Sequence, residues 1–348
     1  MYKNLNNSNQ NVLILGATGF IGGHIARAAL KMNWHVRGLR RKPGMTGHLG
    51  ADAPLEWMEG DLDDPDSLLQ AMRGIDTVFH AAGYYPARQE KRSVFEQVSY
   101  ALRQTANVME SCRRAGIKQL VYTSTLTTIG RPPSGARREA NEEDYYIPGS
   151  VAKSAYYEAK SAMEQSFLQA SKDGFRVVVL NPTAVFGPGD VHLSLGGLLL
   201  AVARGWALGW LPVTINIVDV RDVASAHIQA AIQGRPGERY IIGGHNLTLK
   251  DALTQAASIA KVHPPRFEIP LVFIDALVRL DDILPFVNLS GNHLRTIRLW
   301  PAYDISKARR ELSLSPRPLE ETVRDSLDWF RSQGLLPTRH SEVQDVLQ

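Results

Sequence analysis

The chain has a single cysteine, Cys112, among its 348 residues, so it cannot form an intrachain disulfide. The residues around it, NVMESCRRAG, follow a helical pattern, which favours a small buried side chain over a catalytic thiol. The ten histidines are scattered, without an HExxH motif or a tight cluster with acidic residues. The sequence therefore predicts neither a disulfide framework nor a metal site.

The chain also lacks a strong excess of charge of either sign. Its net charge is +4, its isoelectric point is near 9.1 and 21% of its residues are charged. No basic stripe or nucleic-acid-binding motif accompanies this mild excess, so it does not argue for a DNA or RNA partner. It would suit an anionic cofactor. The hydrophobic content of 44% is ordinary for a soluble globular protein.

Long apolar runs are missing as well. No uncharged run reaches the ~18 residues that a membrane-spanning helix needs. The best candidate, residues 267–289, contains four charged residues between positions 275 and 282 and is typical of an amphipathic helix. Residues 1–10 are polar and rich in asparagine, which predicts a disordered tail rather than a signal peptide. We therefore expect a cytoplasmic protein without membrane insertion.

A glycine motif stands near the start of the chain, where residues 11–23 read NVLILGATGFIGG. A short apolar run leads into Gly16, Gly19 and Gly22, and a helical pattern follows. Gly16 permits a tight turn with positive φ, Gly19 lets the backbone approach a pyrophosphate, and Gly22 lets the helix pack against the strand. Free N–H groups at the start of that helix favour phosphate. By itself, the pattern also fits a glycine-rich turn in another α/β protein.

Strand and helix patterns alternate from residue 11 to about 185, which predicts a parallel sheet with helices on both faces. Strands are predicted at 34–39, 77–80, 119–123 and 177–180, and long helices at 95–115 and 156–171. Beyond this point the loops lengthen, and Gly, Pro and Trp become frequent. The sequence thus predicts an α/β fold, a Rossmann-type doubly wound parallel sheet over residues 11–185, to which residues 215–245 return. A smaller C-terminal substrate-binding lobe, interleaved with the sheet, is predicted over residues 186–340.

Tyr156 and Lys160 lie four residues apart in the stretch SAYYEAKSA, so they share one face of a helix. A phenol has an ordinary pKa of about 10, which is too high for proton transfer near neutral pH. A lysine ammonium and an oxidised nicotinamide close by would favour the phenolate. The same lysine can donate hydrogen bonds to the nicotinamide ribose, while Tyr157 is expected to point elsewhere. The alternative is an exposed helix that carries Tyr and Lys at this spacing without a role.

Hydroxyl side chains gather at the end of an apolar strand pattern, where residues 121–130 read VYTSTLTTIG. A hydroxyl at the carboxyl end of a strand can bind a substrate carbonyl and hold it against the tyrosine. The alternative is that β-branched threonines simply fill a strand.

Together these motifs resemble the short-chain dehydrogenase/reductase superfamily in its extended form, over residues 11–333. The matched stretches are GATGFIG at 16–22, Gly60-Asp61-Leu62, Ala81-Ala82-Gly83, the hydroxyl strand at 121–130, Tyr156 with Lys160, and Asn181-Pro182-Thr183 followed by Gly187-Pro188-Gly189-Asp190. Within the superfamily, the chain is most similar to the dihydroflavonol-4-reductase-like group, which includes the hopanoid-associated sugar epimerase type. The stretches that carry this closer resemblance are residues 216–224, 237–244 and 303–308.

The resemblance implies that Tyr156 is the acid/base and Lys160 its partner. It places the catalytic hydroxyl at Thr125, where the family more often has serine, and Ser124 remains a competitor. Cofactor contacts are implied for Gly16, Thr18, Gly19, Phe20, Ile21, Gly22, Asp61, Leu62, Ala81, Ala82, Thr123, Lys160, Pro182 and Thr183. The family usually has an Asn-Val-x-Gly-Thr run on the long helix, whereas residues 101–105 here read ALRQT. The resemblance therefore does not carry an asparagine-supported water relay to this chain.

The end of the second predicted strand bears on which dinucleotide binds. NAD-binding proteins place Asp or Glu there, where it binds the ribose 2′-hydroxyl. Here the strand ends in Arg40, Arg41 and Lys42. A carboxylate would repel a 2′-phosphate, whereas a guanidinium can bind it through two charge-assisted hydrogen bonds. The sequence predicts NADP(H), with Arg41 at the family's phosphate-contacting position, and the alternative is a solvated basic turn.

Two loops, residues 84–92 and 131–149, fall where ligands bind in this architecture, and we expect them to shape the substrate pocket. Besides Thr125 and Tyr156, the candidate substrate-contacting residues are Tyr84 and His192, with residues 206–210 as a further candidate region. The alternatives are loop surface for the charged residues and lobe packing for the tryptophans.

The predicted reaction is reversible hydride transfer between NADPH and the carbonyl of a small organic substrate. Three alternatives stay open: a sugar-nucleotide epimerase or dehydratase, a 3β-hydroxysteroid dehydrogenase-like enzyme, and a non-catalytic NADP-sensing regulator. The intact pair of Tyr156 and Lys160 argues against the regulator. The resemblance also implies a homodimer through the two long helices. Asp219 and Asp222 are expected to cap helices and make structural hydrogen bonds rather than to form a catalytic pair.

Overall fold

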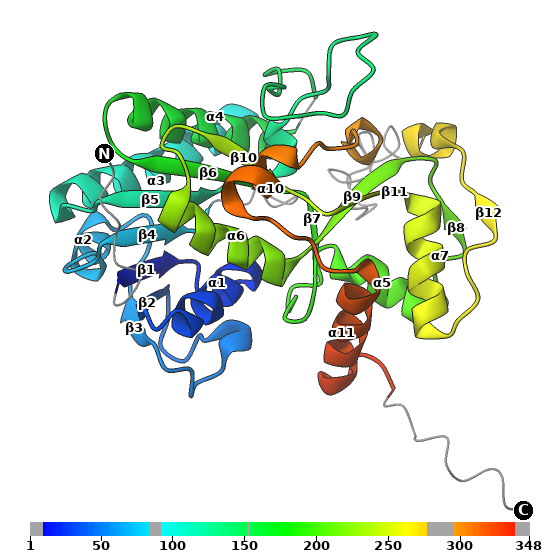
Figure 1. Cartoon of the computed structure of the whole chain (residues 1–348), viewed down its shortest axis with the longest axis horizontal. Coiled ribbons are helices and arrows are strands. Elements are labelled where there is room, and N and C mark those ends of the chain that lie inside the picture. Colours follow the sequence, from blue (N-terminus) through cyan, green and yellow to red (C-terminus); the bar gives the residue numbers. More distant parts are fainter. Residues whose placement is uncertain (1–9, 84–91, 152–153, 277–295, 338–348) are drawn as a thin grey trace, which may run out of the picture.

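The computed structural model describes residues 10–83, 92–151, 154–276 and 296–337. Its main body is a seven-stranded sheet with the order β10-β6-β5-β4-β1-β2-β3, in which all neighbours run parallel (Figure 1). The strands are β1 (Asn11–Leu15), β2 (His35–Arg40), β3 (Glu56–Glu59), β4 (Thr77–His80), β5 (Gln119–Thr123), β6 (Val177–Pro182) and β10 (Arg239–Ile242). The predicted Rossmann-type α/β fold is confirmed.

Helices cover both faces of this sheet, because most crossovers between parallel strands run through a helix. The helices α2 (Pro65–Ala71), α3 (Val94–Ala115) and α4 (Ala155–Lys172) pack side by side on one face. The helices α1 (Phe20–Lys31) and α6 (Val220–Gln233) pack together on the other. The sheet is therefore buried on both sides, which is why its strands read as continuous apolar runs.

The central strand shows how one apolar run serves two cores. Val12 and Ile14 of β1 belong to the core on the α1 and α6 side, while Leu13 and Leu15 belong to the core under α2, α3 and α4. All four side chains are fully buried. Alternate residues of a strand point to opposite faces, so one slip in register would exchange the two sets.

The strand order reverses next to β1. From β1 the chain moves outward to β2 and β3, then crosses back to place β4 on the other side of β1. The helices that follow β1 and β4, α1 and α3, consequently lie on opposite faces of the sheet. At such a point a crevice opens at the carboxyl ends of the strands, where ligands bind in folds of this kind. The glycine motif follows β1 at this position.

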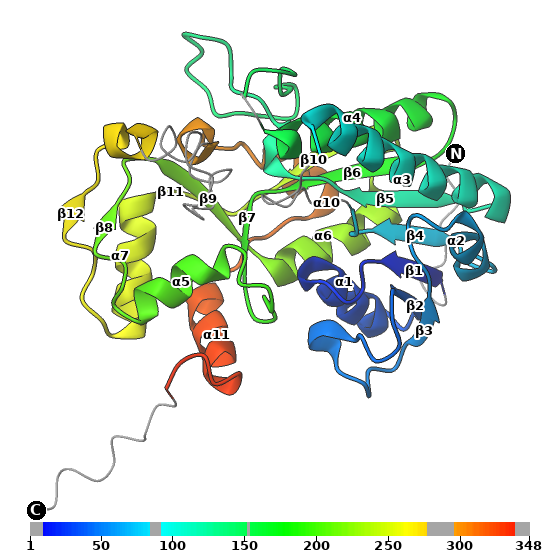
Figure 2. The same cartoon turned by 180° about the vertical axis from the view of Figure 1, so that it is seen from behind.

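A smaller lobe packs beside the carboxyl ends of the sheet (Figures 1 and 2). One three-stranded sheet has the order β11-β9-β7, with β7 and β9 parallel and β9 and β11 antiparallel, and a two-stranded sheet pairs β12 with β8. The lobe elements are β7 (Ala184–Phe186), α5 (Gly196–Ala203), β8 (Gly209–Trp210), β9 (Thr214–Asp219), β11 (His245–Thr248), α7 (Leu249–Ala260), β12 (Phe267–Glu268) and α11 (Leu319–Ser332). Outside it, α10 (Ser306–Leu312) packs on α6 and β10. Short 3₁₀ turns are η1 (Gly47–Leu49), η2 (Leu126–Thr128) and η3 (Ile297–Leu299).

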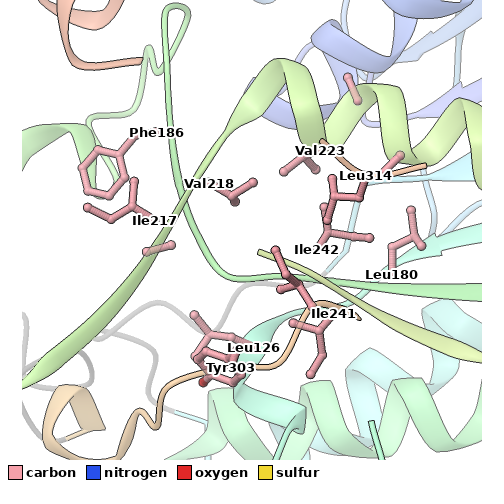
Figure 3. Close-up of a cluster of buried hydrophobic side chains, with 14 of the residues drawn as sticks. Leu126, Leu180, Phe186, Ile217, Val218, Val223, Ile241, Ile242, Tyr303 and Leu314 are labelled. Atoms are coloured by element: carbon pink, nitrogen blue, oxygen red, sulfur yellow. The ribbon is translucent and has the colours of Figure 1, made fainter. Parts of the chain in front are cut away.

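The sequence assigns residues 215–245 to the large sheet, and the structure divides this segment. The helix α6 and the strand β10 lie with the large sheet, whereas β9 and β11 pair in the lobe. Figure 3 shows the buried side chains where the two regions meet, among them Ile217 and Val218 of β9, Val223 of α6 and Ile242 of β10. Because one continuous core joins sheet and lobe, the lobe is held in place over the carboxyl ends of the strands.

Two helix ends follow ordinary capping chemistry, and the predicted burial of the single cysteine is confirmed. Thr248 caps α7 by accepting a hydrogen bond from Asp251 N at 3.0 Å, and Gly116 ends α3 in the left-handed region with φ +70°. Cys112 is fully buried. Of the predicted tail, residues 1–9 lie outside the described residues. Gln10 is buried, and its carbonyl accepts a hydrogen bond from His35 N at 2.9 Å.

The stretch expected to form an amphipathic helix, residues 267–289, starts differently. Phe267 and Glu268 form β12, because their backbone pairs with Gly209 and Trp210 of β8. Residues 271–276 are helical, and the remainder lies outside the described part of the chain. Within the described residues, no helix has the length and apolar character required to cross a membrane.

Candidate active site

The glycine motif forms the turn between β1 and α1. Gly16 has a φ of +91°, and its carbonyl accepts a hydrogen bond from Gly19 N at 2.9 Å. A Cβ on Gly22 would lie only 2.0 Å from the Gly16 oxygen. Both observations confirm the structural roles predicted for these glycines: positive φ at Gly16, and close approach of helix and turn at Gly22.

The start of α1 is shaped to face an anion. Gly19 is its N-cap residue, and among the described residues no side chain caps the helix. The N–H groups of Phe20 and Ile21, together with the helix dipole, therefore favour a phosphate at this end. A Cβ on Gly16 would meet the Ala82 backbone nitrogen at 2.8 Å, so the turn is in contact with the end of β4. A dinucleotide fits this cradle, because a pyrophosphate needs backbone donors and no side chain in its way.

The turn after β3 carries the residues assigned to the adenine end. Asp61 N donates to Ser67 Oγ at 3.1 Å, and Asp61 Oδ1 accepts from Asp63 N at 3.0 Å. The Leu62 carbonyl accepts from Asn107 Nδ2 of α3 at 2.9 Å. These bonds hold the turn in a single conformation between β3 and α2.

Of the three basic residues at the end of β2, one is paired with a carboxylate and two are exposed to solvent. Arg40 lies 3.6 Å from the Glu59 carboxylate and 5.7 Å from the Trp57 ring centroid, so its guanidinium is partly neutralised. Arg41 and Lys42 are exposed, and neither forms an ion pair within the described residues. Of the three cations, Arg41 and Lys42 are therefore available for an added phosphate, while Glu59 compensates Arg40.

Helix α4 brings Tyr156 to the hydroxyl strand. Tyr156 OH donates to Thr125 Oγ1 at 3.4 Å, a long contact between the first turn of α4 and the residue that starts η2. Tyr157 points away, as predicted: it is buried, and its hydroxyl accepts a hydrogen bond from Trp300 Nε1 at 3.2 Å. The structure thus brings together Thr125 and Tyr156 from positions 31 residues apart.

The competing hydroxyl, Ser124, is engaged elsewhere. Its Oγ donates to the carboxylate of Glu164, a side chain that is only 1% exposed. Thr128 Oγ1 and Asn181 Nδ2 each lie 2.6 Å from the same carboxylate oxygen. Sequence reasoning did not identify Glu164. The available signal was its position, four residues after Lys160 and therefore on the same face of α4.

Lys160 lies one turn beyond Tyr156 on α4. Burial lowers the pKa of Lys160 from an ordinary 10.5 to about 8, so most of it stays protonated at pH 7. A Cβ on Gly83 would lie 3.4 Å from Lys160 Nζ, which places the ammonium beside the end of β4. His80, the last residue of β4, is fully buried, and burial together with the charge of Lys160 lowers its pKa to about 3. The sequence reasoning also overlooked His80, whose only signal was a histidine at the end of a buried strand.

Two further residues assigned to cofactor binding have occupied hydroxyls. Thr123 Oγ1 lies 2.8 Å from His227 Nε2, inside the core. Thr183 Oγ1 donates to Asn216 Oδ1 at 2.7 Å and follows Pro182, the last residue of β6. Cofactor contacts by Thr123 or Thr183 would therefore come from the backbone or from methyl groups.

A cavity of about 390 Å³ lies near the start of α4, and neither Thr125 nor Tyr156 belongs to its lining. The chain neighbours Leu126 and Tyr157 belong to its wall. Ile129, Pro132, Pro133, Tyr145, Trp300 and Tyr303 add to a lining that is mostly apolar and aromatic. Part of the predicted loop at 131–149 thus shapes a pocket, as expected of a substrate region.

The other predicted substrate residues have different surroundings. His192 is exposed in the turn between β7 and α5. Trp206 is 67% exposed, with Arg204 lying over its ring. Tyr84 and most of the loop at 84–92 lie outside the described residues.

The departure on the long helix has a local explanation. Ala101 is buried, and Thr105 Oγ1 donates back to its carbonyl at 2.9 Å. Gln104 Nε2 donates to Asp63 Oδ2 at 3.2 Å. Gln104 therefore serves the turn after β3 and Thr105 the helix itself, and neither of these bonds involves Lys160.

Comparison with known proteins places the chain among nicotinamide-dependent enzymes. Residues 12–243 match the model of the NAD dependent epimerase/dehydratase family. A putative dihydroflavonol 4-reductase of Synechocystis sp. is 30% identical over 338 residues, covering 94% of this chain and 96% of its own. The sterol demethylase protein B of Methylococcus capsulatus is 29% identical over 332 residues, covering 93% of this chain and 99% of that protein. Among solved structures, PA4631, a nucleoside-diphosphate-sugar epimerase from Pseudomonas aeruginosa, gives a TM-score of 0.80 at 25% identity, covering 94% and 99%.

Proposed function

Because the chain belongs to the NAD dependent epimerase/dehydratase family, we propose that it is an NADP(H)-dependent oxidoreductase that reduces a ketone or aldehyde of a small organic substrate. The family binds a nicotinamide dinucleotide, and the turn at Gly16, Gly19 and Gly22 fits such a cofactor. Ala81 and Ala82 would line it, Asp61 and Leu62 would contact its adenine end, and Pro182 and Thr183 its nicotinamide end. When bound, the dinucleotide supplies the hydride.

The observation that carries the proposal is the 3.4 Å contact between Tyr156 OH and Thr125 Oγ1. Two hydroxyls at this distance can both donate to one carbonyl oxygen placed beside them. Thr125 orients the carbonyl, and Tyr156 gives its proton to the oxygen as that oxygen gains negative charge. Ser124 cannot replace Thr125 without leaving the Glu164 carboxylate.

Lys160 supports the proton transfer in two ways. Its ammonium lies one helical turn from Tyr156 and stabilises the phenolate that remains after the proton has left. It would also donate a hydrogen bond to the nicotinamide ribose, which would hold the nicotinamide beside Tyr156. The lowered pKa of about 8 means that Lys160 can lose its charge on the alkaline side of neutrality, so activity is expected to decline there.

The preference for NADP(H) rests on Arg41. It is exposed at the end of β2, where no carboxylate occupies the strand terminus. A guanidinium can bind a 2′-phosphate through two hydrogen bonds, with Lys42 adding charge nearby.

The neighbouring cavity favours an apolar substrate. A mostly apolar and aromatic lining suits a flat ring system, and the guanidinium of Arg131 in this lining donates to the Leu299 and Arg298 carbonyls. Two of the relatives are named as a putative dihydroflavonol 4-reductase and a sterol demethylase protein. A 3β-hydroxysteroid dehydrogenase-like activity would use the same residues in the direction of oxidation.

The direct test is a panel of ketones, aldehydes and hydroxysteroids, followed by NADPH loss or NADP⁺ gain. Tyr156→Phe should lower kcat at least about 100-fold, because it removes the general acid. The NADPH dissociation constant should stay within about twofold, since the phenyl ring remains. Retained turnover in Tyr156→Phe would refute the assignment of the acid.

A sugar-nucleotide epimerase or dehydratase is the second candidate, favoured by the likeness to PA4631. Such an enzyme recycles its cofactor in place. Purified protein that retains a tightly bound dinucleotide, and that interconverts sugar nucleotides without net NADPH consumption, would favour it over the reductase.

A non-catalytic NADP-sensing regulator is the least supported alternative. Cofactor binding without turnover of any carbonyl, alcohol or sugar nucleotide would favour it. A homodimer through α3 and α4 and a cytoplasmic location stay predictions, which sedimentation and cell fractionation would measure.

A further inference from the structure

Glu164 is a charged residue in an unusual position. Its side chain is 1% exposed and lies one turn beyond Lys160 on α4, on the helix face that also carries Tyr156. Removing a carboxylate from water costs several kcal/mol unless its oxygens are well paired. The groups that contact Glu164 therefore indicate which part of the structure this buried carboxylate holds in place.

The partners come from three separate parts of the large sheet. On one carboxylate oxygen, Ser124 Oγ, Thr128 Oγ1 and Asn181 Nδ2 converge, from the segment after β5 and from the end of β6. On the other side, Arg239 Nε of β10 lies 3.2 Å from Oε1, and this guanidinium is itself only 3% exposed. One carboxylate thus ties α4 to the segment after β5, to the carboxyl end of β6 and to the first residue of β10.

These bonds enclose the backbone of Thr125. Its flanking hydroxyl, Ser124, binds Glu164 directly. Its own carbonyl oxygen lies 3.3 Å from Asn181 Nδ2 and 2.9 Å from Thr128 Oγ1, the same two groups that contact Glu164. Arg239 Nη2 donates to the Thr128 carbonyl at 2.9 Å, which closes the ring of bonds.

We propose that Glu164 is a positioning residue, which holds the segment 124–128 so that the Thr125 hydroxyl faces Tyr156. The proposal rests on the function proposed above. Tyr156, Lys160 and Glu164 repeat every four residues on α4, so the helix that presents the acid also anchors the hydroxyl that orients the substrate. A change in the Glu164 contacts would alter the distance between Thr125 and Tyr156 without touching the glycine turn. Misplacement of a reacting group by about 1 Å is expected to cost up to about 100-fold in rate.

The test compares Glu164→Gln with Asp222→Asn. Glutamine has the shape of glutamate but no charge: if its amide oxygen accepts from Ser124, Thr128 and Asn181, its amide nitrogen faces the Arg239 guanidinium, donor against donor. Asp222 is a matched control because it is also a buried carboxylate, which accepts from Arg317 N and Nε at 2.9 Å each. It lies at the contact of α6 with the segment before α11, away from Thr125. Both variants should lose thermal stability.

Only Glu164→Gln should lose turnover. We expect its kcat to fall at least about tenfold at a temperature where it is folded, while the NADPH dissociation constant stays within about twofold. Asp222→Asn should keep kcat within about twofold. A kcat loss of the same size in both variants, or a rise in the NADPH dissociation constant that matches the kcat loss, would show that Glu164 only stabilises the fold and would overturn the proposal.

A double-mutant cycle distinguishes a positioning role of Glu164 from a general loss of stability. Thr128→Val keeps the side-chain shape but removes the hydroxyl that contacts Glu164. If Glu164 acts through this segment, the kcat losses of Thr128→Val and Glu164→Gln should combine to less than their product. Fully multiplicative losses would contradict the proposed route.

Hydrogen exchange gives a measurement that needs no substrate. In Glu164→Gln, amides of residues 124–129 should exchange faster than in the natural protein, and those of the glycine turn should not change. This arm separates the two proposals: if no substrate is turned over, the proposed function fails, and faster exchange still supports the positioning of the segment. Unchanged exchange in residues 124–129 would overturn the role of Glu164 on its own.

Discussion

The carboxyl end of the large sheet and the interior of the lobe bury different kinds of side chain. In the large sheet, Glu164, Arg239 and Asn181 are buried together: Asn181 donates a hydrogen bond to Glu164, and Arg239 forms an ion pair with it. In the lobe, the space between α5, α7 and α11 is lined by apolar side chains such as Leu199 and Leu253. The lobe also leaves large apolar side chains on its surface, including Trp206 and Phe267.

This difference corresponds to a division of labour. Hydrogen bonds and ion pairs depend on distance and angle, so a buried polar network holds catalytic groups in one arrangement. Burial of apolar area is not directional, and such interiors accept changes of similar volume with modest loss. We therefore expect substitutions at the carboxyl end of the sheet to change cofactor binding and turnover, and substitutions inside the lobe to change mainly stability and substrate choice.

Gly22→Ala should have the largest effect on cofactor binding. The added Cβ would lie 2.0 Å from the Gly16 oxygen, so the turn or α1 must move. A strain of about 1 to 3 kcal/mol would raise the NADPH dissociation constant roughly 5- to 150-fold if it fell on the bound state. Fluorescence titration with NADPH measures it, and unaltered affinity in a folded variant would mean that the turn does not hold the pyrophosphate.

Arg41→Ala should have a more limited effect, confined to one cofactor. Loss of a charge-assisted contact is expected to lower kcat/KM with NADPH about tenfold and to leave kcat/KM with NADH almost unchanged. Lys42→Ala is the matched control and should lose less. A clear preference for NADH that Arg41→Ala does not alter would remove the NADP(H) assignment.

Acid should destabilise the large sheet through its buried histidines. Burial lowers the pKa of His24 and His80 to about 3 and that of His227 to about 4, so all three are neutral when folded at pH 5. In the unfolded chain they take up protons below about pH 6.5. The unfolded state binds more protons in that range, so the free energy of unfolding falls as the pH drops from about 6.5 toward 4.

Urea unfolding at several pH values measures this slope, which is about 1.4 kcal/mol per pH unit for each histidine that is fully protonated only in the unfolded state. His227→Gln should flatten it by the contribution of one group. A free energy of unfolding that is constant between pH 6.5 and 4.5 would contradict the neutral state of these histidines.

Gly197→Ala should have the smallest effect, and it should raise the stability of the protein rather than lower it. Gly197 lies in α5 of the lobe, and an added Cβ would meet only the Leu193 Cβ, at 3.9 Å. Alanine is the better helix former, so stability is expected to rise by up to about 1 kcal/mol, with NADPH binding unchanged. Thermal unfolding measures it. A destabilised variant would show that the lobe is packed as tightly as the glycine turn.

Much of the fold could be predicted from the sequence, because the signals are local. Apolar runs of four or five residues followed by helical periodicity predict the buried parallel strands, and the order of β1, turn and α1 is visible in residues 11–23. The pairing of Tyr156 with Lys160 follows from helical spacing alone. The assignment of residues 215–245 was less successful, since a strand pattern does not say which sheet the strand joins, and β9 and β11 pair in the lobe.

By itself, the sequence determined the secondary structure around the cradle and the face of α4 that carries the acid, since both depend on neighbours within a few residues. Only the tertiary structure shows that Ser124 is bound to Glu164, 40 residues away, while Thr125 contacts Tyr156. It also decided that Arg40 is compensated by Glu59 across two strands while Arg41 stays exposed. Contacts of this kind connect residues that are distant along the chain, so no local periodicity or spacing records them.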